Sequence, residues 1–273
     1  MPETDAKARK LFSIVTVVYN DVDEIQRTIA SALGQEFDSY EYIIIDGASK
    51  DGTLELIQQY KSRICVLSER DSGLYDAMNK GLDLANSEYV LFLNAGDYFV
   101  NSSVLSNVAA SIGTDRPDCI YGNNYVMLLD GTLTFRKAAS DLSNIWKRSQ
   151  FSHQALFTKT ALARQYKFDL SYSIAADYCM ILRLYLDSFS FLYCDLPISI
   201  YKTGGVSDDR RVRMVRERFS INRKYNNNPK VYLTFPVLLI SAFVKQILKR
   251  VISRRHYESI RRKVMRQPYE TLE

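Results

Sequence analysis

Short apolar runs alternate with amphipathic stretches along the first hundred residues of the chain. The runs are rich in β-branched and aromatic residues, which is typical of buried strands, and they occupy residues 12–18, 42–45, 64–67 and 90–93. Between them, apolar positions recur at helical spacing in residues 25–33, 53–60 and 74–85. This alternation predicts an α/β fold with a largely parallel sheet and helices on its faces.

Local signals place the ends of several elements. Asp21 is followed three residues later by Glu24, the spacing of a capping box at the start of a helix. Beyond residue 100 the pattern changes, and Asp130-Gly131 is a strong hairpin signal within residues 120–135. We expect further helices over 104–112 and 177–186, and further strands over 153–157 and 191–201.

Polar clusters follow each of the first four predicted strands, at residues 19–20, 46–47, 69–73 and 94–97. The carboxyl ends of parallel strands meet at one edge of a sheet, where ligands commonly bind. Asn94 and Asp97 follow the fourth strand and offer the oxygen ligands that Mg²⁺ or Mn²⁺ needs. An ordinary strand-to-helix turn accounts for one such cluster, but four on one edge favour a ligand site.

Composition narrows the class of protein without naming a function. The chain has 273 residues, 47% hydrophobic and 25% charged, with a formal net charge of +5 that is concentrated as basic residues in the last third. Its four cysteines form no CxxC pair, so we expect small buried side chains in a reducing compartment and no zinc or redox motif. Residues 1–10 have no apolar centre, which argues against a secretion signal and for a cytoplasmic location.

Four early segments, in their order and spacing, resemble the inverting family-2 glycosyltransferases of bacterial polysaccharide synthesis, which have the GT-A fold. The segments are Ser13–Asn20, Ile45–Thr53, Asp71–Gly81 and Leu91–Asp97. Weaker similarity continues at His153-Gln154, Ala176-Asp177-Tyr178, Leu182-Arg183 and Gly204–Ser207. The resemblance implies sugar transfer, with inversion, from a nucleoside diphosphate donor to a saccharide carried on a polyprenyl diphosphate lipid, in surface or exopolysaccharide synthesis.

The resemblance also implies a division of the chain. A flexible tail over 1–10 precedes a nucleotide-sugar-binding half over 11–100 and an acceptor-binding half over 101–207. A helical extension, basic and apolar, follows over 208–273.

Donor-binding residues are carried over from the matching segments: Tyr19, Asp46, Asp71, Asn79 and Asn94. An aromatic ring at Tyr19 suits stacking on the base, and the carboxylate of Asp46 suits hydrogen bonds from base or ribose. Each has a structural alternative: packing between strand and helix for Tyr19, turn capping for Asp46, and capping or core polar contacts for Asn79 and Asp71.

Asp97 is the predicted ligand of a divalent Mg²⁺ or Mn²⁺ ion, and His153 is a secondary candidate. Asn94 and Gly96 stand where the family commonly has acids. A purely structural role is the alternative for His153.

Inverting transfer needs one base to take the proton of the attacking hydroxyl. By matched position this base is Asp177, because Ala176 replaces the neighbouring acid. The alternative is that Asp177 only caps the helix that follows it.

The C-terminal extension predicts attachment to anionic lipid. Residues 231–244 are apolar, contain Pro236 and are too short to span a bilayer. Basic residues follow at 245, 249, 250, 254, 255, 261–263 and 266, and within 243–252 apolar positions face them at helical spacing. We expect peripheral attachment to the inner face of the cell membrane; a tail helix with a solvated basic face is the alternative.

Arginines at 210, 211, 213, 216 and 218 are candidates for the lipid diphosphate, and a solvated helix face is an equal alternative. No base-reading motif accompanies the charge, so no nucleic-acid partner is expected.

Two other functions compete with the enzyme. The missing acids at positions 94, 96 and 176 favour a non-catalytic nucleotide-binding or scaffolding subunit of a membrane assembly. A nucleotidyltransferase would share the sheet but would need a glycine-rich phosphate loop after the first strand, where the chain has Tyr19-Asn20-Asp21.

Overall fold

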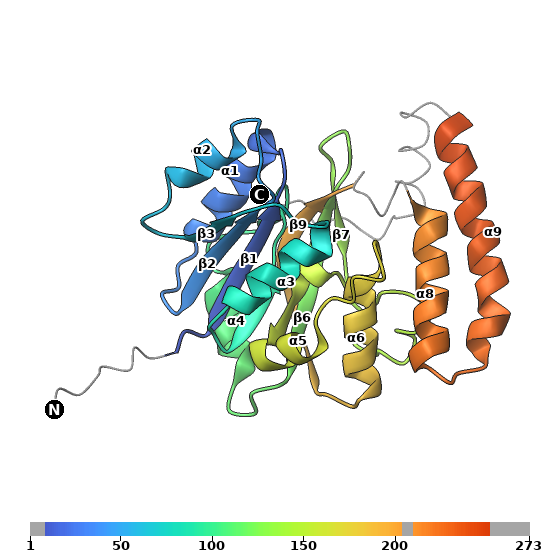
Figure 1. The fold of residues 1–273 in the computed structure, drawn as a ribbon. Helices are drawn as coiled ribbons and strands as arrows, with labels where there is room; N and C mark the ends of the chain where they lie inside the picture. The colour runs from blue at the N-terminus through green and yellow to red at the C-terminus, as the bar shows by residue number, and fades with distance from the viewer. Residues whose placement is uncertain (1–8, 204–209, 252–273) are drawn as a thin grey trace.

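The computed structural model describes residues 9–203 and 210–251, with side chains described to residue 247 (Figure 1). Strands and helices alternate as far as the fourth strand: β1 (Phe12–Val18), α1 (Val22–Leu33), β2 (Tyr40–Asp46), α2 (Thr53–Gln58), β3 (Cys65–Ser68), α3 (Leu74–Leu84) and β4 (Tyr89–Phe92). The predicted tail over 1–10 falls almost wholly outside the described residues. Within them, Arg9 already donates a hydrogen bond of 2.6 Å to the carbonyl of Ser87.

The second half adds shorter elements and a helical pair. They are β5 (Tyr98–Phe99), α4 (Val104–Ile112), β6 (Cys119–Met127), β7 (Leu133–Arg136), the 3₁₀ turn η1 (His153–Ala155), β8 (Leu156–Lys159), α5 (Thr160–Tyr166), α6 (Ala176–Leu186), β9 (Phe191–Lys202), α8 (Arg211–Tyr225) and α9 (Lys230–Val251). The predicted hairpin is confirmed, since β6 pairs with β7 and Gly131 takes a positive φ of 83° in the turn. The strand predicted to begin at His153 begins three residues later, because residues 153–155 form the 3₁₀ turn.

The described strands form one nine-stranded sheet in the order β3-β2-β1-β4-β8-β6-β9-β5, with β7 paired to β6. The first four strands along this order are parallel, as predicted, so their carboxyl ends lie on one edge. Beyond β4 the sheet is mixed, because β8 runs antiparallel to both of its neighbours. Strands from both halves of the chain therefore share one sheet.

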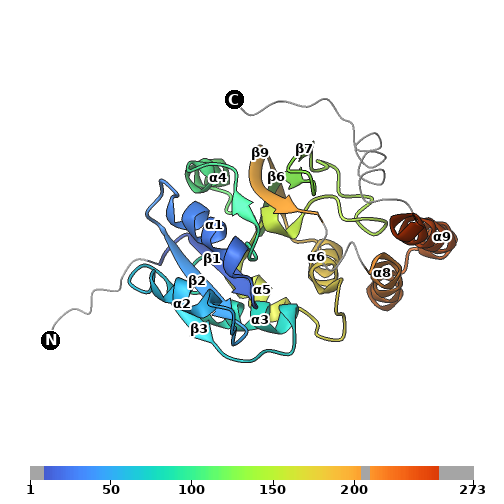
Figure 2. The same cartoon turned by 90° about the horizontal axis from the view of Figure 1, so that it is seen from above.

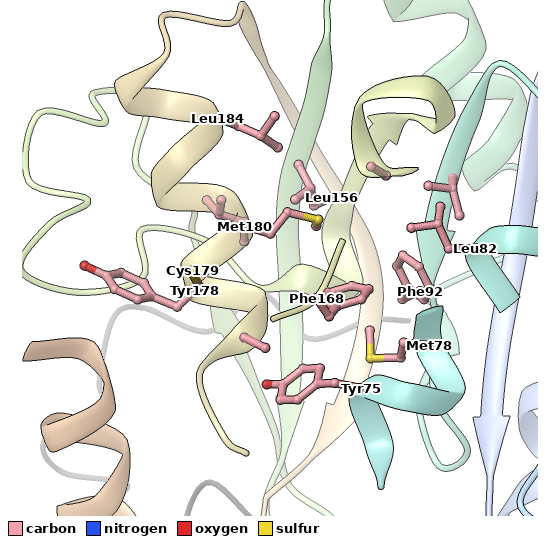
Figure 3. Packing of buried hydrophobic residues seen from close by; sticks show 14 of the residues in the cluster. Tyr75, Met78, Leu82, Phe92, Leu156, Phe168, Tyr178, Cys179, Met180 and Leu184 are labelled. Carbon is pink, nitrogen blue, oxygen red and sulfur yellow. The ribbon is translucent and has the colours of Figure 1, made fainter. Parts of the chain in front are cut away.

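Helices cover both faces of the sheet, with α1 and α4 on one and α3, α5 and α6 on the other (Figure 2). β1 is buried at every position, as expected for a strand covered on both sides. On the α3 side, the ring of Phe168 stacks on Tyr75 at 5.5 Å and meets Phe92 edge-on at 5.0 Å (Figure 3). These three rings fix the distance between α3, the sheet and the segment that leads to α6.

Two local predictions were wrong. The side chain of Asp21 makes no cap hydrogen bond, and Asp51 instead accepts from the backbone N–H of Val22 at 3.2 Å. The carboxylate that satisfies the start of α1 thus comes from the loop after β2, which ties the two loops together. Cys65 is exposed, whereas the other three cysteines are buried as expected.

Helices α8 and α9 form an antiparallel pair beside α6, with α9 outermost (Figures 1 and 2). The rings of Phe219 on α8 and Phe235 on α9 stack at 3.9 Å. Helix α9 continues through Pro236, so the prediction that the apolar segment is too short to span a bilayer does not hold for the helix. Residues Lys230–Ile247 are long and apolar enough to cross a membrane, by length and composition only, and 11% of them are buried.

Candidate active site

Tyr19, Gly47 and Asp71 lie together at the carboxyl edge of the parallel strands. A β-carbon added to Gly47 would lie 2.7 Å from a carboxylate oxygen of Asp71 and 3.1 Å from the ring of Tyr19, so a side chain there would displace Asp71 and press on Tyr19. Tyr19 is 65% exposed although it is a large aromatic residue, which contradicts the alternative of a buried wedge. An open ring beside a carboxylate is the arrangement expected of a site that stacks and hydrogen-bonds a nucleotide base.

Asp46 is fully buried at the end of β2 and organises the neighbouring loops. Its carboxylate accepts from the N–H of Ser49 at 3.2 Å and from the hydroxyl of Ser68 at 2.6 Å. Asn20 and the 49–50 loop are likewise joined, since Asn20 Oδ1 accepts from the N–H of Lys50 at 2.8 Å. Asp46 therefore holds the shape of the edge, which fits the turn-capping alternative, and any contact with a donor adds to that role.

The segment after β4 forms a tight turn in which the N–H of Asp97 donates to the carbonyl of Asn94 at 2.9 Å. Gly96 has a φ of 86°, a conformation that strains other residues, which explains why no acid stands there. The turn is fixed from α1, because the hydroxyl of Thr28 accepts from the N–H of Gly96 at 3.0 Å.

Asp97 is 7% exposed, and its carboxylate accepts a hydrogen bond of 3.1 Å from Gln154. Burial raises the pKa of Asp97 to about 7, and this effect outweighs the positive charge of His153 and the hydrogen bond from Gln154. A buried carboxyl with so high a pKa lacks a full counter-charge, which is expected of a residue whose partner is a ligand.

His153 and Asp177 form the centre of the site. His153 Nδ1 lies 3.2 Å from Asp177 Oδ2, and each side chain is 21% exposed. Burial works against both charges, but the hydrogen bond and mutual attraction prevail: the pKa of His153 is raised and that of Asp177 is lowered. Asp177 is thus ionised at neutral pH. The N-cap alternative is wrong, because Ala175 is the N-cap of α6 and Asp177 is the second residue inside the helix, in its first turn.

Tyr75 holds the second oxygen of this carboxylate. It lies within the Asp71–Gly81 segment, but no role was predicted for it. Its hydroxyl lies 3.0 Å from Asp177 Oδ1 and 2.9 Å from the carbonyl of Ile174. Figure 3 shows its ring beside Phe168. Asn79 exchanges two hydrogen bonds of 2.9 Å with the backbone of Phe168. This arrangement fits the alternative of a polar contact in the core and not a contact with the donor.

Glu217 on α8 was missed as well, and the neighbouring Arg218 was predicted only as a candidate for the lipid diphosphate. One carboxylate oxygen of Glu217 accepts from the backbone N–H groups of Ile174 at 2.9 Å and Ala175 at 3.1 Å, which fixes the approach to α6. The charge of Arg218 helps to lower the pKa of Asp177. Both residues lie in an arginine-rich stretch, for which the sequence suggested a solvated helix face or a phosphate site. Glu217 is the one acid within residues 210–218, and this was the signal that could have marked it as a residue with a specific partner.

The residues around Asp97 suit a divalent ion only in part. Among the described residues no group of three or more histidine, cysteine or acidic side chains is placed to hold a metal. Two buried atoms in this region, Asn94 Oδ1 and His153 Nε2, have no hydrogen-bond partner in the described structure. Asn94 begins the turn that ends at Asp97, and His153 is near enough for its charge to act on the pKa of Asp97. Two oxygen-bearing side chains and one imidazole in this region would suit an ion that takes its remaining ligands from diphosphate and water.

This arrangement combines an edge that suits a base, a buried acid that suits a metal–diphosphate, and an ionised carboxylate held from two sides. The family model for glycosyl transferase family 2 matches residues 13–186. The PGL/p-HBAD biosynthesis glycosyltransferase of Mycobacterium tuberculosis is 30% identical over 209 residues, which cover 74% of this chain and 80% of the relative.

Two further comparisons are more distant. WfaP of Escherichia coli, named a UDP-Glc:alpha-D-GlcNAc-diphosphoundecaprenol beta-1,3-glucosyltransferase, is 34% identical over 119 residues, or 43% of this chain and 47% of WfaP. The mannosyltransferase PcManGT of Pyrobaculum calidifontis, solved with GDP-Man and Mn²⁺, superposes with a TM-score of 0.64 at 14% identity and covers 94% of this chain and 80% of its own. This chain therefore belongs to glycosyl transferase family 2: it is a glycosyltransferase with the GT-A fold.

Proposed function

We propose that this glycosyltransferase moves one sugar, with inversion, from a nucleoside diphosphate to a lipid-linked saccharide at the cytoplasmic face of the membrane, in surface or exopolysaccharide synthesis. The observation that carries the proposal is the carboxylate of Asp177, ionised and held by His153 on one oxygen and by Tyr75 on the other. A carboxylate fixed in this way beside a nucleotide-binding edge is suited to act as a base on an acceptor hydroxyl.

In this reaction the acceptor oxygen forms a bond to the anomeric carbon while the bond from that carbon to the diphosphate breaks. The electron pair leaves with the nucleoside diphosphate, and the acceptor proton passes to Asp177. His153 and Arg218 lower the pKa of Asp177, so it is a weak base at the start. It takes the proton only as the attacking hydroxyl becomes acidic in an oxocarbenium-like transition state.

At the donor side, Tyr19 and Asp71 bind the base and ribose, with Asp46 holding their loops in place. Asp97, with His153 Nε2 and Asn94 Oδ1 beside it, holds Mg²⁺ or Mn²⁺ together with the donor diphosphate. The ion neutralises charge on the departing diphosphate when it is bound. The Mn²⁺ in PcManGT supports this assignment by likeness of fold.

The lipid-linked acceptor is supported by one relative and one helix. WfaP is named for a saccharide on diphosphoundecaprenol. Helix α9 is 22 residues long, about 33 Å at 1.5 Å per residue, and it exposes large apolar side chains such as Leu233, Val237 and Ile240. Apolar side chains exposed in such number mark a membrane or protein contact. The basic residues beyond Val251 that favoured peripheral attachment lie outside the described residues, as does the Gly204–Ser207 segment.

A thermal-shift panel tests the donor site. UDP, GDP, dTDP and CMP are added with and without Mn²⁺ to the wild type and to Asp97→Asn. We expect one nucleotide to stabilise the wild type in the presence of Mn²⁺, and the Mn²⁺-dependent part of that shift to vanish in the variant. The exposed acid Asp23 provides a matched control, since Asp23→Asn leaves the shift unchanged. Stabilisation by no nucleotide would contradict the proposal and favour a non-catalytic scaffolding role.

A further inference from the structure

A cavity of about 170 Å³ lies between α8, α9 and the segment 146–148, apart from the donor edge. Five cationic residues line it: Lys147, Arg148, Arg211, Arg218 and Lys245. No acidic side chain is among the described residues of its wall. Four of these residues carry the argument, namely Lys147, Arg148, Arg218 and Lys245, because cations on a wall with no described acid favour an anionic occupant and arginine is well suited to phosphate.

The rest of the wall is largely apolar. Phe219, Phe235, Leu238 and Val231 contribute side chains to it, and the first two form the ring stack that joins the helices. The same helix α9 turns Leu233, Val237 and Ile240 outward, where they are between 64% and 78% exposed. Cationic and apolar walls in one cavity, next to an exposed apolar helix, suit an amphiphile with an anionic head and a hydrocarbon chain.

The cavity is connected to the proposed base through α6. Tyr178, the residue after Asp177, donates its hydroxyl to the carbonyl of Trp146 at 2.7 Å, and Asn222 donates to that hydroxyl at 2.9 Å. The guanidinium of Arg218 lies over the ring of Tyr178, 4.8 Å from its centre, and its Nη2 donates to Ser149 at 2.7 Å. Its Nε atom is buried without a hydrogen-bond partner in the described structure.

We infer that this cavity binds the diphosphate and the first isoprenoid units of the lipid acceptor. The inference rests on the proposed function and adds to it the place where the lipid is held. Lys147, Arg148 and Lys245 meet the diphosphate at the mouth, and Arg218 meets it on the side nearest the active site. The hydrocarbon chain leaves along α9. A diphosphate at Arg218 brings the sugar attached to it toward Asp177, so lipid and base act on one acceptor.

Ligand binding in this cavity can be followed by intrinsic fluorescence, because Trp146 in the cavity wall is the single tryptophan of the chain. Farnesyl diphosphate, kept below the concentration at which it forms micelles, is titrated into the full chain while Trp146 emission is recorded. We expect a saturable change, with inorganic pyrophosphate and farnesol each binding at least tenfold more weakly. The double variant Arg148→Gln, Lys245→Gln alters two exposed side chains and weakens farnesyl diphosphate about tenfold or more. Arg223→Gln, exposed on the same helix but outside the cavity wall, leaves it unchanged.

The outcomes separate this inference from the proposed function. Binding of UDP in the thermal-shift panel without any saturable response to farnesyl diphosphate overturns the lipid site and leaves the enzyme assignment intact. Equal affinity for pyrophosphate overturns it as well, since the occupant is then a free phosphate. An undiminished response in the double variant also overturns it, because the lipid then binds elsewhere near Trp146.

Discussion

Replacing Asp97 with asparagine is expected to stabilise the ligand-free protein while removing metal-dependent donor binding. The carboxyl is buried, and its pKa in the folded chain is about 7, against 3.8 for an ordinary aspartate. At 1.36 kcal/mol per unit, this shift corresponds to about 4 kcal/mol of lost folding free energy at pH 8. The unfolded chain is ionised above pH 4, whereas the folded chain keeps the proton until about pH 7, so stability falls as pH rises through this window.

Asparagine has a similar shape and no charge to bury. Because it must still be buried as a polar group, we expect it to recover about half of that loss, or about 2 kcal/mol, which raises the melting temperature by roughly 4–8 °C at pH 8. Because asparagine does not titrate, the stability difference between variant and wild type should rise by about 2.6 kcal/mol between pH 5 and pH 8, from slightly below zero to about 2 kcal/mol in favour of the variant.

Thermal melting of both proteins across this pH range, without metal or nucleotide, provides the measurement. Asp23→Asn, on the exposed surface of α1, serves as the control and should show no such growth with pH. A variant no more stable than the wild type at pH 8, or a difference that does not change with pH, would refute the reasoning that Asp97 is an uncompensated buried acid.

Other residues of the site give three further predictions. Tyr75→Phe removes the hydrogen bond to Asp177 and should lower kcat about 3–10-fold, consistent with the loss of about 1 kcal/mol, while the Kd for the nucleotide stays within twofold; an unchanged kcat would show that Tyr75 does not position the base. Gly47→Ala pushes a β-carbon against Asp71 and should weaken nucleotide binding at least tenfold in calorimetric titration, so wild-type affinity would contradict a donor site there. Lowering the pH from 8 to 6 should weaken Mn²⁺ binding in the presence of nucleotide, with proton release on binding, because Asp97 with its pKa of about 7 and His153 with its raised pKa must both lose a proton to bind a metal; pH-independent affinity would contradict a metal site at these two residues.

Periodicity in the sequence was sufficient to predict the parallel part of the fold. Each of the first four strands is a short apolar run, and each ends near its predicted residue. Burial on both faces leaves little choice of side chain in β1, β2 and β4, whereas β3 lies at the edge of the sheet and is partly exposed. The mixed part of the sheet was not predicted in register. Its pairings join residues far apart in sequence, as in β6 and β9, and local pattern does not encode such partners.

The site was predictable only where a motif carried it. Asp97 and Asp177 were predicted as site residues, and in the structure both lie near enough to His153 for their charges to act on its pKa. Glu217 was not assigned to the site, and Arg218 was predicted to contact the lipid diphosphate and not Asp177, because their partners lie more than thirty residues away and only the packing of α8 on α6 brings them there. Asn79 lies in one of the matching segments and was therefore predicted to bind the donor. In the structure its side chain hydrogen-bonds the backbone of Phe168 instead.

The membrane prediction depended on helix length. Pro236 within the apolar segment suggested an interruption, since proline lacks an N–H and clashes with the preceding turn. The structure carries α9 through it from Lys230 to Val251. Sequence alone did not show that continuity, because packing of α9 against α8 stabilises a helix whose local preference is weaker there.

The most direct test of the account compares Asp177→Asn with the wild type in donor binding and in transfer. Both proteins are titrated with the nucleotide identified by the thermal-shift panel, and both are assayed for release of that nucleotide from its sugar in the presence of membrane lipid extract. If Asp177 is the base, the Kd stays within about twofold and turnover falls by about 10²–10⁴-fold. Retention of more than a tenth of wild-type turnover would contradict the assignment of Asp177 as the base.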